Sequence, residues 1–219
     1  MKLALFDLDH TLIDFDSGMA WTQHLVALGV LEAAAEQRYL DFCHQYVAGT
    51  LDIHAMQRAV MTPLAAFAPA QLQAWRDQFA QSLAARLSPA AQALVAGHRE
   101  RGDLCAIVTA TSRWVAEPFA RAFGIEHLVA TEWQMVDGRP SGAIDGLPCY
   151  REHKPTRVEA WLAGLNLSPL AGFDDSWFYS DSASDIALLQ CVTHPVAVRP
   201  DPRLRERCRT AGWPVIETL

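Results

Sequence analysis

Short apolar runs that end in polar residues alternate with segments of helical periodicity along most of the chain. Residues 2–6 (KLALF) form such a run and end in acids, which is typical of a central strand. Further strands are expected within 103–112, 125–131, 176–189, 193–198 and 214–216, with helices between them. Because strands that alternate with helices form a parallel sheet, the pattern predicts an α/β fold with helices on both faces of the sheet.

The pattern changes between about residue 16 and residue 86, where only helical spacing is found. Trp21, Leu25 and Leu28 recur at helical intervals and precede Gly29, a typical helix stop. Three more helices are indicated by Tyr39, Phe42 and Tyr46, by the Asp52 cap before Met56 and Val60, and by Pro69 before Leu72, Trp75 and Phe79. We therefore expect an all-helical insert over 15–86, and a core formed by 1–14 and 87–219.

One two-stranded element interrupts the alternation. The dipeptide Asp137-Gly138 lies between short extended runs within 132–148, and Asp-Gly is a strong hairpin signal. The domain division given above assigns this hairpin to the core.

The amino-acid composition indicates which binding partners and which cellular compartment to expect. The net charge is −7, so neither nucleic acid nor an anionic membrane surface is an expected partner, since both favour a basic protein. The five arginines within 199–209 have the spacing of a solvated helix. The five cysteines match neither a disulfide framework nor a zinc site, which favours the cytoplasm. No secretory signal and no membrane span are expected, and the sequence gives no prediction of oligomeric state.

Acidic and hydroxyl side chains follow the apolar runs where the expected strands end. Asp7 and Asp9 follow the first strand, Thr109 lies late in the second, and Asp181 and Asp185 follow a later one. The carboxyl ends of parallel strands meet at one edge of a sheet, where ligands bind in open α/β folds. Buried carboxylates need compensation, and two so close together indicate a cation such as Mg²⁺, which prefers oxygen ligands.

The chain resembles the phosphatases of the haloacid dehalogenase superfamily in four motifs that occur in the family's order. They are Asp7-Leu8-Asp9-His10-Thr11, Thr109 at the end of AIVT, Lys154, and Asp181-Ser182-Ala183-Ser184-Asp185. A helical insert between the first two motifs is similar to the C1 type of cap in subfamily IB, the group of phosphoserine phosphatase and its relatives. The resemblance covers most of the chain and implies a Rossmann-like core with a helical cap.

The resemblance also implies roles in catalysis. Asp7 would be the nucleophile that forms an aspartyl-phosphate, and Asp9 would be the general acid and then the general base. Thr109 would donate hydrogen bonds to the phosphate, and Lys154 would stabilise the developing negative charge.

A Mg²⁺ ion is the cofactor that the resemblance implies. It would be bound by Asp7, by the backbone carbonyl of Asp9 and by Asp181, with Asp185 bound directly or through water. An ion in this position would offset the repulsion between the carboxylates and a phosphate dianion.

Substrate preference is expected from the helical insert. Asp16 matches a glutamate that contacts the substrate amino group in phosphoserine phosphatases, although it could equally serve only as a helix cap. The arginine that binds the substrate carboxylate in those enzymes aligns with Val60, and Arg58 lies about 200° away around a helix. Histidinol phosphate, an amine without a carboxylate, is therefore favoured and phosphoserine comes next, with Asp16 and Arg58 as candidate binding residues. Other candidates in the insert are Trp21, His24, His44 and Tyr46.

The sequence leaves other functions open. The same aspartyl-phosphate could transfer its phosphoryl group to an alcohol, as in a phosphotransferase or mutase. The chain could also be a non-catalytic binding protein, although Asp7, Asp9 and Lys154 are all retained. Dehalogenation does not need a second aspartate, so Asp9 counts against it. We expect a Mg²⁺-dependent phosphomonoester hydrolase of amino-acid biosynthesis, with a small phosphorylated metabolite as its substrate.

Overall fold

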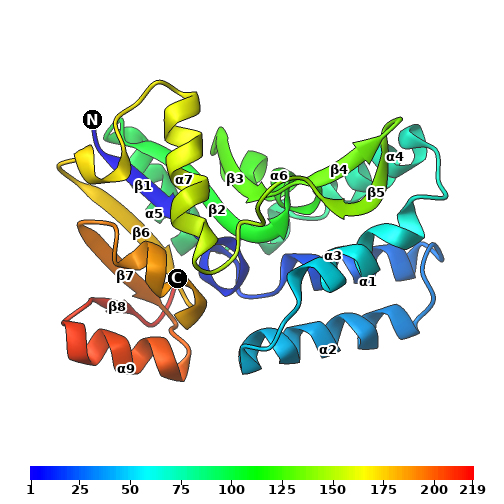
Figure 1. Cartoon of the computed structure of the whole chain (residues 1–219), viewed down its shortest axis with the longest axis horizontal. Coiled ribbons are helices and arrows are strands. Elements are labelled where there is room, and N and C mark those ends of the chain that lie inside the picture. The colour runs from blue at the N-terminus through cyan, green and yellow to red at the C-terminus, as the bar shows by residue number, and fades with distance from the viewer.

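A computed structural model describes residues 1–219, and its elements follow the alternation of the sequence (Figure 1). The strands are β1 (Leu3–Phe6), β2 (Leu104–Ser112), β3 (His127–Thr131), β4 (Trp133–Val136), β5 (Arg139–Ile144), β6 (Ser176–Ser180), β7 (His194–Val198) and β8 (Val215–Ile216). The α-helices are α1 (Ser17–Ala27), α2 (Ala34–Ala48), α3 (Ile53–Met61), α4 (Pro69–Gln81), α5 (Pro89–Glu100), α6 (Arg113–Ala122), α7 (His153–Gly164), α8 (Ile186–Leu189) and α9 (Pro202–Ala211). None of these helices combines the length and the apolar character that crossing a membrane requires.

Six parallel strands form the main sheet, in the order β3-β2-β1-β6-β7-β8. Strand β1 lies in the interior of this sheet, and all of its residues are buried. Ala4 and Phe6 belong to one apolar cluster and Leu3 and Leu5 to another, because successive side chains of a strand point to opposite faces. Both faces are thus covered by apolar side chains, as the continuous apolar run of β1 predicts.

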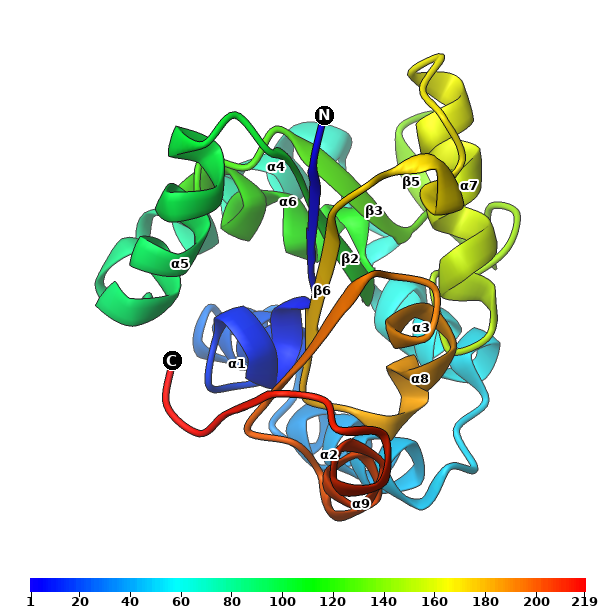
Figure 2. The ribbon, with the colours of Figure 1, turned by 90° about the vertical axis from the view of Figure 1, so that its left-hand side faces the viewer.

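Helices cover the two faces of the sheet. Val95 of α5 and Phe119 of α6 pack on the face of Phe6. Val158 of α7 and Leu204 of α9 pack on the opposite face. Figure 2 shows α5 and α7 on opposite sides of β1 and β6. The predicted α/β fold, a parallel sheet with helices on both faces, is confirmed.

The segment between β1 and α5 contains helices α1 to α4 and no strand, as its periodicity predicts. The hairpin at Asp137-Gly138 also forms, as the antiparallel pair β4–β5. This hairpin packs against α3, so it lies with the helical segment at the right of Figure 1 although it follows β3 in the chain. The division into a core (1–14 and 87–219) and a cap (15–86) stays a prediction.

Candidate active site

Asp7 lies directly after β1, at the carboxyl edge of the sheet. Its backbone N–H donates to the carbonyl of Tyr179 on β6 at 2.9 Å, and its side chain is buried. The chain then makes one wide turn over Leu8–Leu12, in which His10 has a left-handed backbone at φ 57°. This turn returns the Thr11 hydroxyl to the Asp7 carboxylate.

Lys154 joins two of the predicted carboxylates. The side chain is 2% exposed, and its ammonium donates to Asp7 Oδ1 at 2.9 Å and to Asp185 Oδ2 at 2.7 Å. The hydroxyl of Ser180 donates to the same Asp185 oxygen at 2.8 Å. Burial alone would lower the pKa of Lys154, but the carboxylates of Asp185 and Asp7 hold that pKa well above its usual value. Lys154 therefore supplies a fixed positive charge at this edge.

Thr11 brings Asp7 and Asp181 together. Thr11 Oγ1 lies 3.2 Å from Asp7 Oδ2 and 3.3 Å from Asp181 Oδ1, and it accepts the Asp181 backbone N–H at 3.0 Å. Burial raises the pKa of Asp7 to about 7, against the opposing effect of Lys154. Burial, and then the charge of Asp7, also raise the pKa of Asp181. Ionisation of both carboxyls is therefore disfavoured at this edge, where Lys154 contacts Asp7 and Asp185.

The donor set at this edge fits Mg²⁺. Asp7 and Asp181 offer carboxylate oxygens on either side of one hydroxyl, and Asp185 Oδ1 is buried without a hydrogen-bond partner. No three His, Cys, Asp or Glu side chains form a ready metal cluster, and Lys154 lies between Asp7 and Asp185. Mg²⁺ usually takes one or two carboxylates and keeps several water ligands. Asp7 and Asp181 therefore suit it as side-chain ligands without a third.

Asp9 is hydrogen-bonded to the first residue of α1 and to β2, and not to Lys154 or Thr11. Its carboxylate accepts the backbone N–H of Ser17 at 2.6 Å and the hydroxyl of Thr111 at 2.7 Å. Burial, and then the charge of Asp16, raise the pKa of Asp9 to about 6 despite these hydrogen bonds. A carboxyl group with such a pKa can both give and accept a proton near neutral pH.

Thr109 lies in an irregular stretch of β2. The pairing of β2 with β3 shifts register between Val108 and Ser112, and irregularities of this kind are common beside active sites. The buried Thr109 hydroxyl accepts the backbone N–H of Thr111 at 3.1 Å, and both threonines line the same cavity as Asp7. The hydroxyl hydrogen of Thr109 remains free to donate into that cavity.

The cavity has a volume of about 750 Å³ and lies between the sheet edge and the helical segment. Its floor is polar and contains Asp7, Asp9 and Asp181. Its wall on the helical side is mainly apolar and includes Phe42, Leu51, Ile53, Met56 and Val60. A ligand in this cavity would therefore have one charged end and one apolar or aromatic end.

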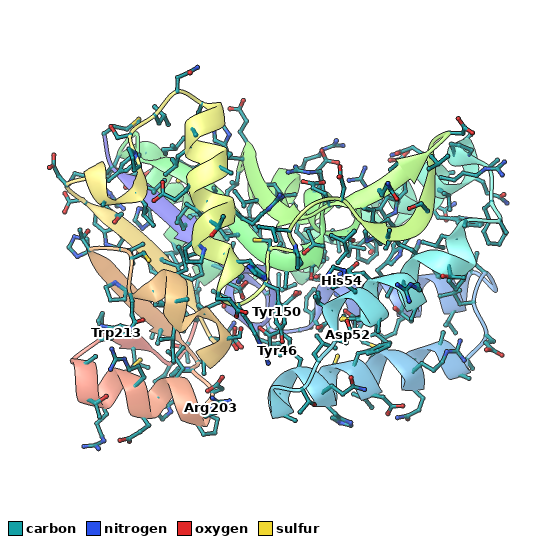
Figure 3. All side chains as sticks on the ribbon, in the orientation of Figure 1. Tyr46, Asp52, His54, Tyr150, Arg203 and Trp213 are labelled. Atoms are coloured by element: carbon teal, nitrogen blue, oxygen red, sulfur yellow. The ribbon has the colours of Figure 1, made fainter.

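A tyrosine and two arginines lie at the end of α2. The Tyr46 hydroxyl lies 2.6 Å from the Ser184 hydroxyl, and these two residues belong to opposite walls of the cavity. Arg151 and Arg203 each have a guanidinium nitrogen within 4 Å of the point that a β-carbon on Gly49 would occupy. Figure 3 shows Tyr46 and Arg203 where α2 and α9 face each other.

Asp16 and Arg58, the two predicted substrate-binding residues, have different positions. Asp16 lines the cavity, and its Oδ1 also accepts the backbone N–H of Met19 at 2.7 Å, so it is both a wall residue and a helix cap. Burial is the main cause of its raised pKa. Arg58 is exposed and does not line the cavity, because it lies on the face of α3 beside Gly142 of the hairpin.

The other four candidate residues in the helical segment also differ in whether they line the cavity. Tyr46 lines the cavity. Trp21 is buried in the apolar core, His24 is hydrogen-bonded to the Trp75 carbonyl, and His44 is exposed. None of these three lines the cavity.

The polar residues of the cavity region that were not assigned from the sequence include Thr11, Thr111 and Gln57. Thr11 belongs to the first motif and Thr111 to the polar end of the second strand. Their closeness in sequence to the assigned site residues could have identified them. The sequence around Gln57 did not indicate a role for it, because Trp133, the residue that orients it, lies 76 positions away in the chain.

Comparisons with known proteins agree with this geometry. The model of the haloacid dehalogenase-like hydrolase family matches residues 4–190. The histidinol-phosphatase of Neisseria meningitidis serogroup C (strain 8013) is 36% identical over 218 residues, which are 98% of each chain. Similarity to this relative thus extends through the helical segment as well as the sheet.

Solved structures share the fold. A protein of unknown function from Bordetella pertussis Tohama I is 44% identical, with a TM-score of 0.90 over 99% of this chain and 98% of that chain. A substrate-bound phosphoserine phosphatase has a TM-score of 0.71 over 99% of this chain and 93% of that chain, at 17% identity, which shows a shared fold. Since the family model covers most of the chain and the Neisseria relative aligns over nearly its full length, the chain belongs to the haloacid dehalogenase-like hydrolase family.

Proposed function

We propose that this enzyme is a Mg²⁺-dependent phosphatase that acts through an aspartyl-phosphate on Asp7. One observation carries the proposal: a buried carboxylate at the sheet edge, with Lys154 on one side and Asp181 on the other, lies in the floor of a cavity. A second carboxyl, Asp9, lies in the same floor with a pKa of about 6. Paired carboxyls in different environments suit a nucleophile and an acid–base group.

The residues divide the reaction into two steps. Asp7 attacks phosphorus, the bond from phosphorus to the substrate oxygen breaks, and Asp9 gives its proton to the leaving oxygen. Asp9 then accepts a proton from a water that attacks the aspartyl-phosphate, which releases phosphate and frees Asp7. Lys154 and the Thr109 hydroxyl stabilise the negative charge of the phosphoryl oxygens.

The cation belongs beside the nucleophile. Asp7 and Asp181 would bind Mg²⁺ through their carboxylates, and Asp9 would bind it through its backbone carbonyl. Asp185 would lie beside the ion, where it is hydrogen-bonded to Lys154. The ion, when bound, neutralises charge on the transferring phosphoryl group. This role explains why so many carboxylates are tolerated around one lysine.

The substrate we favour is histidinol phosphate, with phosphoserine next. Asp16 provides a carboxylate in the cavity wall for an ammonium group. The wall formed by α3 presents Met56 and Val60 but no arginine, which suits a ring better than a carboxylate. The Neisseria relative is named a histidinol-phosphatase, and this agrees with the choice.

The test is phosphate release from histidinol phosphate, phosphoserine and unrelated sugar phosphates, with and without Mg²⁺. Asp7→Asn is the blank, since it keeps the shape of the residue and removes the nucleophile. We expect histidinol phosphate to have the highest kcat/KM, at or above ~10⁴ M⁻¹s⁻¹. If phosphoserine were best, the carboxylate would have to be bound by Arg151 or Arg203, which line the cavity. If no substrate exceeded the blank, the proposal would be wrong.

A further inference from the structure

Gln57 is a buried polar residue in a mainly apolar wall of the cavity. It lies on α3, is 4% exposed, and lines the cavity beside Met56 and Val60. Its carboxamide has two donor hydrogens on nitrogen and an oxygen acceptor. The contacts of each atom therefore determine what the residue offers to a ligand.

The orientation of this carboxamide is fixed by Trp133. The indole nitrogen of Trp133 lies 2.7 Å from Gln57 Oε1, and an indole N–H can only donate. The atom of Gln57 that faces it must be the oxygen, which settles the usual ambiguity between amide oxygen and nitrogen. The amide nitrogen is the other end of the same carboxamide and makes no hydrogen bond to the protein. It is not fully buried, so it is open to the cavity that Gln57 lines.

Trp133 is itself held in place. It is the first residue of β4 and is largely buried. Its ring stacks on Trp114 at 6.3 Å with an interplanar angle of 15°, and the guanidinium of Arg76 lies 4.7 Å from the Trp114 ring. The hairpin thus packs on α3 and fixes a donor in the cavity wall, so the donor is oriented before a ligand binds.

We propose that Gln57 is a specificity-determining residue whose amide N–H donates to an uncharged acceptor on the alcohol part of the substrate. The acceptor would be a ring nitrogen or a carbonyl oxygen, at the end of the molecule away from the phosphate. A carboxylate is disfavoured, because a neutral amide among apolar side chains would not compensate its charge and Asp16 lies in the same cavity. The inference rests on the proposed function and adds a feature of the substrate to it.

The test uses three amino-alcohol phosphates that share the amine and the phosphate. Histidinol phosphate carries a ring nitrogen, asparaginol phosphate a carbonyl oxygen, and leucinol phosphate no acceptor. We expect Gln57→Leu to lower kcat/KM about tenfold for the first substrate, mainly through KM, and less than about twofold for leucinol phosphate. The response of asparaginol phosphate decides between the two acceptor types.

Trp133→Phe provides a second variant, because it removes the donor that orients the amide and leaves Gln57 in place. It should reduce the preference for histidinol phosphate over leucinol phosphate in the same direction as Gln57→Leu. Gln73→Leu on α4 is the matched control, since Gln73 is exposed and bonded to Asp77. It should leave the preference unchanged.

Equal losses on all three substrates, or no loss on either histidinol phosphate or asparaginol phosphate, would overturn the inference. If the wild type hydrolysed none of them, the choice of histidinol phosphate as substrate would be wrong, but Gln57 could still be tested by calorimetric titration of histidinol and leucinol. Weaker binding of histidinol alone to Gln57→Leu would support the inference. Unchanged binding of both alcohols would contradict it.

Discussion

At the scale of single residues, the carboxylates of the sheet edge have unequal surroundings. Asp7 and Asp185 share the Lys154 ammonium, whereas the side-chain donor to Asp181 is Thr11. Burial, and then the charge of Asp7, raise the pKa of Asp181. Without metal, the ionised form of Asp181 is therefore disfavoured, and a bound cation would stabilise it.

Asp181→Asn should therefore raise the stability of the metal-free protein and lower its activity. We expect the variant, without metal and at about pH 8, to unfold with a free energy roughly 1 kcal/mol higher than the wild type, because one like charge is removed. Hydrolysis should fall on the order of a hundredfold or more, since a ligand of the cation is lost. Urea denaturation and phosphate release measure the two effects. A variant that was both less stable and fully active would contradict the assignment of Asp181.

Another buried titratable residue, His98, lies on α5 and does not line the cavity. Its Nδ1 is 2.7 Å from Asp103 Oδ2 and its Nε2 is 2.8 Å from the Tyr179 hydroxyl. Burial lowers the pKa of His98 below its ordinary value of 6.5, and the hydrogen bond with Asp103 only partly opposes this. The folded protein therefore favours the neutral ring.

The contribution of His98 to stability should decline in acid. Below its ordinary pKa of 6.5 the unfolded chain binds a proton that the folded chain does not, so stability is lost as pH falls toward the folded pKa. We expect the difference in unfolding free energy between wild type and His98→Gln to shrink as pH falls from about 7 to about 5. The active-site carboxyls have raised pKa values, so their contribution to stability changes with pH in the opposite direction. Both proteins contain these carboxyls, so that contribution cancels in the difference. A difference that grew in acid would mean that the ring is charged in the folded state.

At the scale of elements, α1 and α2 approach closely at one glycine. A β-carbon on Gly18 of α1 would overlap the hydroxyl of Tyr39 on α2, and both residues line the cavity. The hydroxyl of Thr22 donates to the Gly18 carbonyl at 2.9 Å, which adds to the order of this turn of α1. The glycine is needed here for space.

Gly18→Ala should therefore destabilise the protein by about 1–3 kcal/mol, because Tyr39 must move to admit the methyl group. Gly164→Ala is the control: Gly164 is also helical, but nothing lies within 4 Å of its β-carbon position. That change should be neutral or stabilising by up to about 1 kcal/mol. Chemical denaturation of both variants checks the comparison, and equal effects would contradict this account of α1–α2 packing.

The elements themselves were largely predictable from the sequence. Apolar runs such as 2–6 became buried strands, and helical spacing such as that of Trp21 and Leu25 became α1, because each pattern reflects burial within one local segment. The glycines after α1 and α2 ended those helices with left-handed backbone, as their positions indicated. The Asp-Gly turn likewise formed the β4–β5 hairpin.

What the sequence could not predict were contacts between distant elements. The packing of the hairpin on α3 decides which face of that helix meets the cavity: Gln57 faces it, and Arg58 lies beside Gly142. Periodicity cannot distinguish these two neighbouring polar residues. In the same way, the first motif contained Thr11, but only the turn after β1 shows that its hydroxyl joins Asp7 to Asp181.

At the scale of the whole molecule, one apolar cluster extends from the sheet into the helical segment. Phe79 of α4 packs on Trp21 of α1 at 5.3 Å and on Phe119 of α6 at 5.7 Å between ring centroids. These rings belong to the same buried cluster as Phe6 of β1. Arg76 on α4 also donates to the Trp114 carbonyl at 2.7 Å, which ties the same helices together.

The helical segment and the sheet should therefore unfold together. Urea transitions followed by far-UV circular dichroism and by tryptophan fluorescence should coincide. Phe79→Ala should lower the unfolding free energy by about 3–5 kcal/mol and shift both transitions equally, because it opens a cavity in the shared cluster. Two separate transitions, with only one moved by the substitution, would show that the segments are independent.

The central claim is that Asp7 carries the phosphoryl group, and trapping that group tests it most directly. Asp9→Asn would be mixed with Mg²⁺ and p-nitrophenyl phosphate, whose leaving group needs no general acid, so the intermediate forms and its hydrolysis is slowed. Acid quenching and borohydride reduction convert an aspartyl-phosphate to homoserine, which peptide mass spectrometry locates. We predict homoserine at residue 7, and none in the variant that also carries Asp7→Asn. Nitrophenol release without homoserine at residue 7, or homoserine at another aspartate, would contradict the account.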